Sequence, residues 1–62
     1  MKLLFTIKES SAAIGISRAR IYELISVGEI RTCKLGHRTL IRSEELQRFA
    51  GSLPDGKQSA GQ

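Results

Sequence analysis

The chain has 62 residues, and its 10 Lys and Arg outnumber its 6 Asp and Glu, which gives a formal net charge of +4. This length accommodates one small core and no second domain, so we expect no deep catalytic pocket and no enzyme. A single cysteine, Cys33, excludes an intramolecular disulfide and a zinc site built from cysteines. The positive charge suits a polyanionic partner, and the cysteine count fits a reducing, cytoplasmic location.

The first predicted helix begins directly after a short apolar stretch. Residues 2–5 favour either a brief strand or an extended lead-in, and this run is too short for a signal peptide or a membrane span. Thr6 to Glu9 then matches a capping box, in which the Thr hydroxyl and the Glu carboxylate each bond a free backbone amide. A helix is therefore predicted from Ile7 to Ile14, with Gly15 as the left-handed residue that ends it.

A second helix is predicted after a very short turn. Ser17 is suited to cap it, and the helix then runs from Arg18 until Gly28 closes it. Helical spacing places four residues on the face toward the core, namely Ile21, Leu24, Ile25 and Gly28. The opposite face carries Ala19, Tyr22, Glu23 and Ser26, with Arg18 and Arg20 flanking it.

A β-hairpin is predicted after this helix. Two runs of β-compatible residues, Ile30 to Leu35 and Thr39 to Arg42, flank a three-residue turn, Gly36-His37-Arg38. Such a hairpin would form a wing beside the second helix.

A short third helix is predicted to complete the domain. Ser43 is expected to cap this helix, which ends near Ala50 and turns Leu46 and Phe49 toward the core. The domain is thus expected to span residues 1–50. Residues 51–62 are rich in Gly, Ser and Gln and are predicted to form a disordered tail.

These elements together predict a small α+β fold of the winged helix-turn-helix type: a helix-turn-helix, a β-hairpin wing and a short C-terminal helix. In such a fold the second helix enters the major groove of double-stranded DNA, where Arg can bond O6 and N7 of guanine. The wing meets the phosphate backbone or the minor groove. The expected DNA-binding residues are Ser17, Arg18, Ala19, Arg20, Tyr22, Glu23, Lys34, His37 and Arg38.

Charge distribution favours this interpretation over a generally basic, soluble surface. Basic residues gather at the start of the second helix and around the hairpin. Three of the six acids, Glu9, Glu44 and Glu45, fall in the first turns of predicted helices, where they complement the helix dipoles and leave the basic face uncovered.

Several of these side chains also have simpler interpretations. Arg18 and Arg20 could be solvated, although a positive charge at a helix start opposes the dipole. The Tyr22 hydroxyl could bond a phosphate, or the ring could pack against the wing. Glu23 could accept a bond from cytosine N4, but a pair with Arg20 at i, i+3 spacing is favoured.

The hairpin residues likewise have alternatives. Lys34 and Arg38 could be ordinary charges on an exposed turn. Cys33 is most simply a small strand residue. His37 has no second histidine, carboxylate pair or activated serine nearby, so we expect no metal, no cofactor and no catalytic base.

From Phe5 to Phe49 the chain resembles the excisionase-type DNA-binding domain, a MerR-like winged helix found in recombination directionality factors of phages and plasmids and in small regulators. His37 stands where the family often has a second glycine, and Ala13 is smaller than is usual in the first helix. The residues that carry the resemblance are Thr6, Glu9, Ala12, Gly15, Ile16, Ser17, Ile21, Tyr22, Ile25, Gly28, Ile30, Lys34, Gly36, Arg38, Ile41 and Leu46.

The resemblance implies a protein that acts by binding DNA. Several copies would bind adjacent sites and bend the DNA, so that a tyrosine or serine integrase of a phage assembles the excisive complex. The location would be the cytoplasm of a bacterial host, at the nucleoid. A minimal transcriptional regulator of the same fold is an alternative, and a protein-interaction adaptor such as an antirepressor is an alternative of another class.

Overall fold

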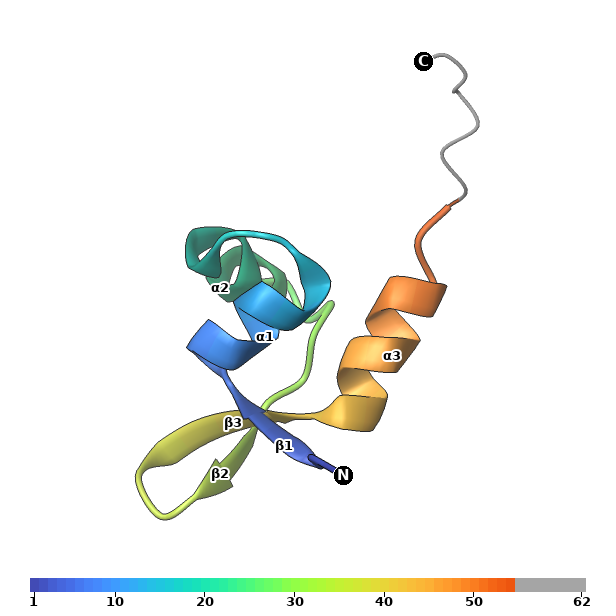
Figure 1. Cartoon of the computed structure of the whole chain (residues 1–62). Helices are drawn as coiled ribbons and strands as arrows, with labels where there is room; N and C mark the ends of the chain where they lie inside the picture. The colour runs from blue at the N-terminus through green and yellow to red at the C-terminus, as the bar shows by residue number, and fades with distance from the viewer. Residues whose placement is uncertain (55–62) are drawn as a thin grey trace.

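The structure is a computed structural model, and it describes residues 1–54. Most of the predicted disordered tail, residues 55–62, lies outside the described residues. The elements in chain order are β1 (Leu4–Thr6), α1 (Ile7–Ile14), α2 (Arg18–Ser26), β2 (Cys33–Leu35), β3 (Arg38–Arg42) and α3 (Ser43–Gly51). The chain therefore adopts the predicted small α+β winged helix-turn-helix fold (Figure 1).

Helix α1 has the predicted bounds and caps. The Thr6 hydroxyl accepts a hydrogen bond from the Glu9 N–H at 3.0 Å, and the Thr6 N–H donates to the Glu9 carboxylate at 2.9 Å. At the other end Gly15 has a φ of 78°, a conformation that residues with a Cβ rarely adopt. Its N–H donates to the Ser11 carbonyl at 2.9 Å. The chain reverses there and enters α2 after Ser17.

Helix α2 has the predicted residues at both of its ends. The Ser17 hydroxyl accepts a hydrogen bond from the Arg20 N–H at 3.1 Å, which confirms the predicted N-cap. The helix ends at Ser26 with Val27 as its C-cap, and Gly28, with a φ of 85°, is the left-handed residue that closes it, as predicted.

The end of α2 is stabilised by backbone hydrogen bonds from the residues that follow. The N–H groups of Gly28 and Glu29 donate to the carbonyls of Ile25 and Leu24 at 3.1 and 2.8 Å. This is the Schellman pattern, and it satisfies carbonyls that have no partner within the helix.

The three strands form one antiparallel sheet in the order β1-β3-β2. Residues 4–6 pair with residues 40–42, so the N-terminal segment is a true strand. Strand β3 lies between its two partners and carries two buried residues, Leu40 and Ile41, on opposite faces of the sheet.

The predicted hairpin is correct in kind but its strand and turn boundaries are wrong. The first strand begins at Cys33, three residues later than Ile30, because the preceding N–H groups bond elsewhere. The Ile30 N–H donates to the Leu24 carbonyl, and the Arg31 N–H donates to the Glu45 carboxylate. These groups are therefore not available to a β-ladder.

The wing turn has two residues and not the predicted three. Arg38 pairs with Leu35 as the first residue of β3, which leaves Gly36 and His37 as the turn. Gly36 has a φ of 63°, whereas no residue other than glycine has a positive φ in the described part of the chain. This matches a type II′ turn, in which glycine takes the first central position and His37 is tolerated at the second.

The predicted N-cap of the third helix is also wrong. Ser43 is the first residue of α3, and Arg42 is the N-cap without a side-chain hydrogen bond. Strand β3 runs directly into α3, so Ser43 is already helical, and its N–H donates to the Leu3 carbonyl at 2.9 Å. The helix ends at Gly51, next to the predicted end at Ala50.

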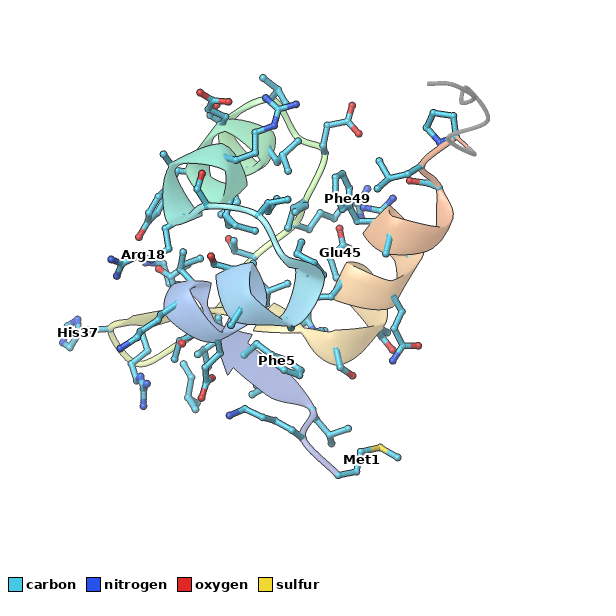
Figure 2. The ribbon with its side chains drawn as sticks, turned by 45° about the horizontal axis from the view of Figure 1, so that its top comes forward. Met1, Phe5, Arg18, His37, Glu45 and Phe49 are labelled. Carbon is cyan, nitrogen blue, oxygen red and sulfur yellow. The ribbon has the colours of Figure 1, made fainter. Side chains whose placement is uncertain are left out.

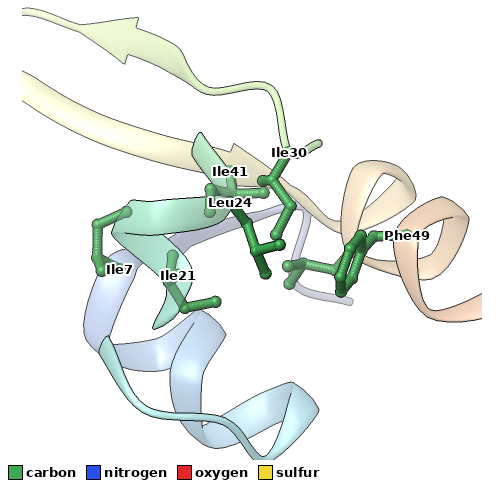
Figure 3. Close-up of a cluster of buried hydrophobic side chains, with 7 residues drawn as sticks. Ile7, Ile21, Leu24, Ile30, Ile41 and Phe49 are labelled. Carbon is green, nitrogen blue, oxygen red and sulfur yellow. The ribbon is translucent and has the colours of Figure 1, made fainter. Parts of the chain in front are cut away.

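One hydrophobic core holds the helices on the sheet. Its buried side chains come from the three helices, from β3 and from the segment that follows α2 (Figure 3). Leu46 and Phe49 of α3 take part, as predicted. The core residues are Ile7, Ile21, Leu24, Ile30, Ile41, Leu46 and Phe49.

Candidate nucleic-acid interface

The first turns of α2 project the predicted helix residues into solvent. Ile21 and Leu24 are buried and fix the rotation of the helix, and Ile25 is half-buried behind them. The six predicted contact residues of this element are all exposed: Ser17, Arg18, Ala19, Arg20, Tyr22 and Glu23. They point in different directions around the helix, however: Arg18 projects away from Phe49 (Figure 2), whereas Arg20 and Glu23 line a hollow with Phe49 and Leu53 on the α3 side.

The two arginines in the first turn of α2 differ in their surroundings. The Arg20 guanidinium donates to the Glu23 carboxylate at 2.8 Å, which confirms the predicted i, i+3 pair. Arg18 has no ion pair and no side-chain hydrogen bond within residues 1–54. Arg18 can therefore approach an external acceptor without losing an existing partner.

Tyr22 is the middle residue of α2, one turn after Arg18. Its side chain is 58% exposed, so both the ring and the hydroxyl are accessible from outside. The residue is thus available for contact with a phosphate or sugar.

The wing carries the other three predicted contact residues, and all three are exposed: Lys34, His37 and Arg38. Directly paired residues of an antiparallel ladder share a face, and successive residues alternate. Lys34 pairs with Thr39 and so lies on the same face as Ile41, toward the helices. Arg38 lies on the reverse face. The two basic side chains therefore flank the wing from opposite sides.

One exposed wing residue was not singled out from the sequence. Leu35 pairs with Arg38 on the reverse face and is 62% exposed. A large apolar side chain beside a basic wing tip suits contact with sugars or an opened base step in a minor groove. The sequence did offer one indication of its exposure: Leu35 is next to the predicted turn, where a strand has no core beneath it.

The start of α2 and the tip of the wing lie on the same side of the molecule. In Figure 2, Arg18 and His37 both project to the left, away from Phe49 on α3. Figure 1 shows the same division, with α2 and the wing on one side and α3 on the other. We call the exposed residues of α2 and the wing tip the α2–wing face.

Three acidic residues of the described helices are ion-paired: Glu9, Glu23 and Glu45. Glu9 is ion-paired with Lys2, and this hydrogen bond, together with the one from the Thr6 N–H, lowers the pKa of Glu9. Glu44 and Glu45 occupy the first turn of α3. Glu23 is the acid on the α2–wing face, and it is paired with Arg20.

Two other kinds of feature, a metal site and a membrane-spanning helix, were sought in the described part of the chain. Within residues 1–54 no three His, Cys, Asp or Glu side chains gather in a way that could hold a metal ion. None of the helices there has the length and apolar character needed to cross a membrane.

The fold and the α2–wing face define a DNA-binding helix-turn-helix module. The family model described as Helix-turn-helix domain matches residues 4–53, which include all six elements, and the chain belongs to this family. No curated protein and no solved structure gives a significant match to the chain.

Proposed function

We propose that this helix-turn-helix protein is an excisionase, a recombination directionality factor with a MerR-like winged helix. The observation that carries its DNA-binding mode is the α2–wing face, which presents Arg18, without a side-chain partner among residues 1–54, and the wing tip on one side of the molecule. The resemblance of Phe5 to Phe49 to excisionase-type domains supports the more specific role.

In the proposed complex the start of α2 enters the major groove. Arg18 reads guanine through O6 and N7, and Arg20 reaches a base or phosphate in an orientation set by Glu23. Ser17 and Tyr22 bond phosphate or sugar oxygens, and Ala19 allows close approach of the helix to the base edges.

The wing meets the backbone beside that groove. Lys34 and Arg38 leave opposite faces of the hairpin, so they suit the two phosphate rows on either side of a wing that enters a minor groove. His37, at the tip, would reach furthest. These contacts position the protein and carry little sequence information.

The proposed activity requires several copies. One small domain offers a limited interface, so specificity and tight binding come from adjacent sites whose occupants raise each other's effective concentration. Bending a site by 40–90° costs on the order of 1–6 kcal/mol, which contacts from successive copies and from a phage integrase would offset. The protein would act by binding alone, without enzyme activity or cofactor, at the bacterial nucleoid.

The bending of DNA tests this proposal. Donor and acceptor dyes are placed at the ends of a fragment carrying several adjacent sites, and energy transfer is measured while the protein is titrated. We expect the end-to-end distance to shorten stepwise as copies load, and an isolated site to bind more weakly than a site in the array. A fragment that stays straight at saturation would instead favour the minimal transcriptional regulator.

A further inference from the structure

The segment between α2 and the wing, residues 29–31, is held by α3. The Arg31 N–H donates to the Glu45 carboxylate at 2.9 Å, and the Arg48 guanidinium donates to the Glu29 carbonyl at 2.7 Å. Glu45 and Arg48 also bond each other through two contacts, at 2.6 and 3.1 Å. We call Glu45 and Arg48 the α3 clamp.

The α3 clamp is partly buried, and its carboxylate is strongly stabilised in the ionised form. The Glu45 side chain is only 14% exposed, and Ile30, which lies between the two clamped backbone groups, is 1% exposed. The hydrogen bond from Arg48, followed by that from the Arg31 N–H, lowers the pKa of Glu45 to about 2. Glu45 is therefore ionised throughout the pH range in which DNA binding is measured.

The clamped segment joins the two halves of the α2–wing face. On one side, the Glu29 N–H is bonded to the Leu24 carbonyl of α2 at 2.8 Å. On the other side, α3 continues β3 without a loop, and β3 is the second strand of the wing. The clamp therefore closes a ring of contacts that runs from α2 through residues 29–31 to α3 and back through the wing.

The clamp itself lies away from the α2–wing face. Figure 2 places Glu45 on α3, across the molecule from Arg18 and His37. An effect of the clamp on DNA binding must therefore act through the position of α2 and the wing.

We propose that Glu45 and Arg48 are positioning residues for DNA binding, which fix residues 29–31 and thereby hold α2 and the wing at the angle at which both reach one duplex. This inference rests on the proposed wing contacts. Two elements that are already held in the bound geometry need not be ordered on binding, and this preorganisation increases affinity.

The matched pair of variants is Glu45→Gln and Glu44→Gln. Both residues lie in the first turn of α3, so both substitutions change the net charge and the helix dipole interaction equally. Only Glu45 bonds Arg48 and the Arg31 N–H. Affinity is measured by fluorescence anisotropy on short duplexes that the wild-type chain has selected from a random pool. The temperature is one at which circular dichroism shows each variant fully folded.

We expect the affinity of Glu45→Gln for DNA to be at least about threefold lower than that of Glu44→Gln. An effect of this size is typical of residues that interact through a shared backbone shift. Arg48→Gln should act in the same direction. In addition, Lys34→Ala should weaken binding by a smaller factor in the Glu45→Gln background than in the wild type. A purely structural role would leave the factor for Lys34→Ala unchanged.

Two outcomes would overturn the proposal while leaving the wing contacts intact. In one, Glu45→Gln binds as Glu44→Gln does. In the other, Lys34→Ala is equally harmful in both backgrounds. If Lys34→Ala and Arg38→Ala have no effect even in the wild type, the proposed wing contact fails, and the positioning role fails with it.

Discussion

Arg18 and Arg20 occupy the same exposed turn of α2 but are not equivalent. Arg20 is held by Glu23 at 2.8 Å, whereas Arg18 has no such partner in the described residues. A side chain that is already paired must share or lose that partner to bind a base. We therefore assign the main base contact to Arg18 and a secondary, oriented contact to Arg20.

Replacing Glu23 distinguishes its two possible roles. If Glu23 only orients Arg20, Glu23→Gln removes a negative charge from the α2–wing face and should increase affinity for all duplexes, because repulsion from phosphates is reduced. The measurement is a titration of a selected and a scrambled duplex with both proteins. Loss of affinity for the selected duplex alone would show that Glu23 accepts a bond from a base.

Ser10 is a second residue whose surroundings lead to a prediction. Its side chain is fully buried, and its hydroxyl has no hydrogen-bond partner within residues 1–54. Because a buried polar group without a partner is destabilising, Ser10→Ala should raise the free energy of unfolding by about 1 kcal/mol. Urea denaturation measures this change.

Ser11→Ala is the matched control for this substitution. The Ser11 hydroxyl donates to the Ile16 carbonyl in the turn before α2, so its removal should destabilise the protein. A lower stability of Ser10→Ala would mean that the buried hydroxyl does have a partner, such as an internal water.

At the scale of elements, local sequence patterns predicted the helix-turn-helix closely. The residues that cap the starts of its helices bond to near neighbours in the chain. Thr6 caps α1 through Glu9, and Ser17 caps α2 through Arg20. Both contacts join residues three positions apart, which a motif can reveal.

The sequence did not predict the contacts that depend on distant residues. The N-cap of α3 differs from the predicted Ser43 because β3 continues directly into the helix. The Ser43 N–H therefore donates to the Leu3 carbonyl. The first wing strand starts late because the Arg31 N–H bonds Glu45, 14 residues away. Of the site, the exposed helix face could be predicted, whereas the separation of Lys34 and Arg38 onto opposite faces depends on the strand register.

The wing turn supplies a prediction at this scale. Gly36 adopts a left-handed φ of 63° with open space around its Cα, so the effect of a side chain there is conformational. Gly36→Ala should lower the free energy of unfolding by about 1–2 kcal/mol. His37→Ala, in the next position, should change stability little. Thermal denaturation compares them, and equal effects would contradict the proposed turn type.

The α3 clamp predicts a pH dependence of stability. The pKa of Glu45 is lowered from 4.5 to about 2 in the folded chain, mainly by the hydrogen bond from Arg48. A lowered carboxyl pKa stabilises the folded state above the unfolded pKa, and this contribution is lost as the pH falls through the folded pKa. Wild type should therefore exceed Glu45→Gln in stability by on the order of 1 kcal/mol at neutral pH.

This difference in the free energy of unfolding between wild type and Glu45→Gln should shrink as the pH falls from 4.5 and vanish near 2. Urea denaturation across that range measures it, with Glu44→Gln as the control that lacks these bonds. A difference that is independent of pH would show that the carboxylate charge is not responsible.

At the scale of the whole molecule, the fold separates the side that we propose to contact DNA from a supporting side. The α2–wing face lies on one side, and α3 closes the core and clamps residues 29–31 on the other (Figures 1 and 2). A single small core connects the two sides, so the geometry of the face depends on contacts made across the whole domain. The central claim is that α2 reads sequence and the wing binds phosphates from this one face.

The salt dependence of DNA binding tests that claim most directly. Affinity for a selected and a scrambled duplex is measured over a range of salt concentrations for wild type, Arg18→Ala and Lys34→Ala. Arg18→Ala should weaken binding to the selected duplex by about 1–3 kcal/mol and reduce the preference for it. Lys34→Ala should weaken binding to both duplexes alike and reduce the slope of log affinity against log salt by about one unit. A changed preference with an unchanged slope for Lys34→Ala, or an unchanged preference for Arg18→Ala, would contradict the account.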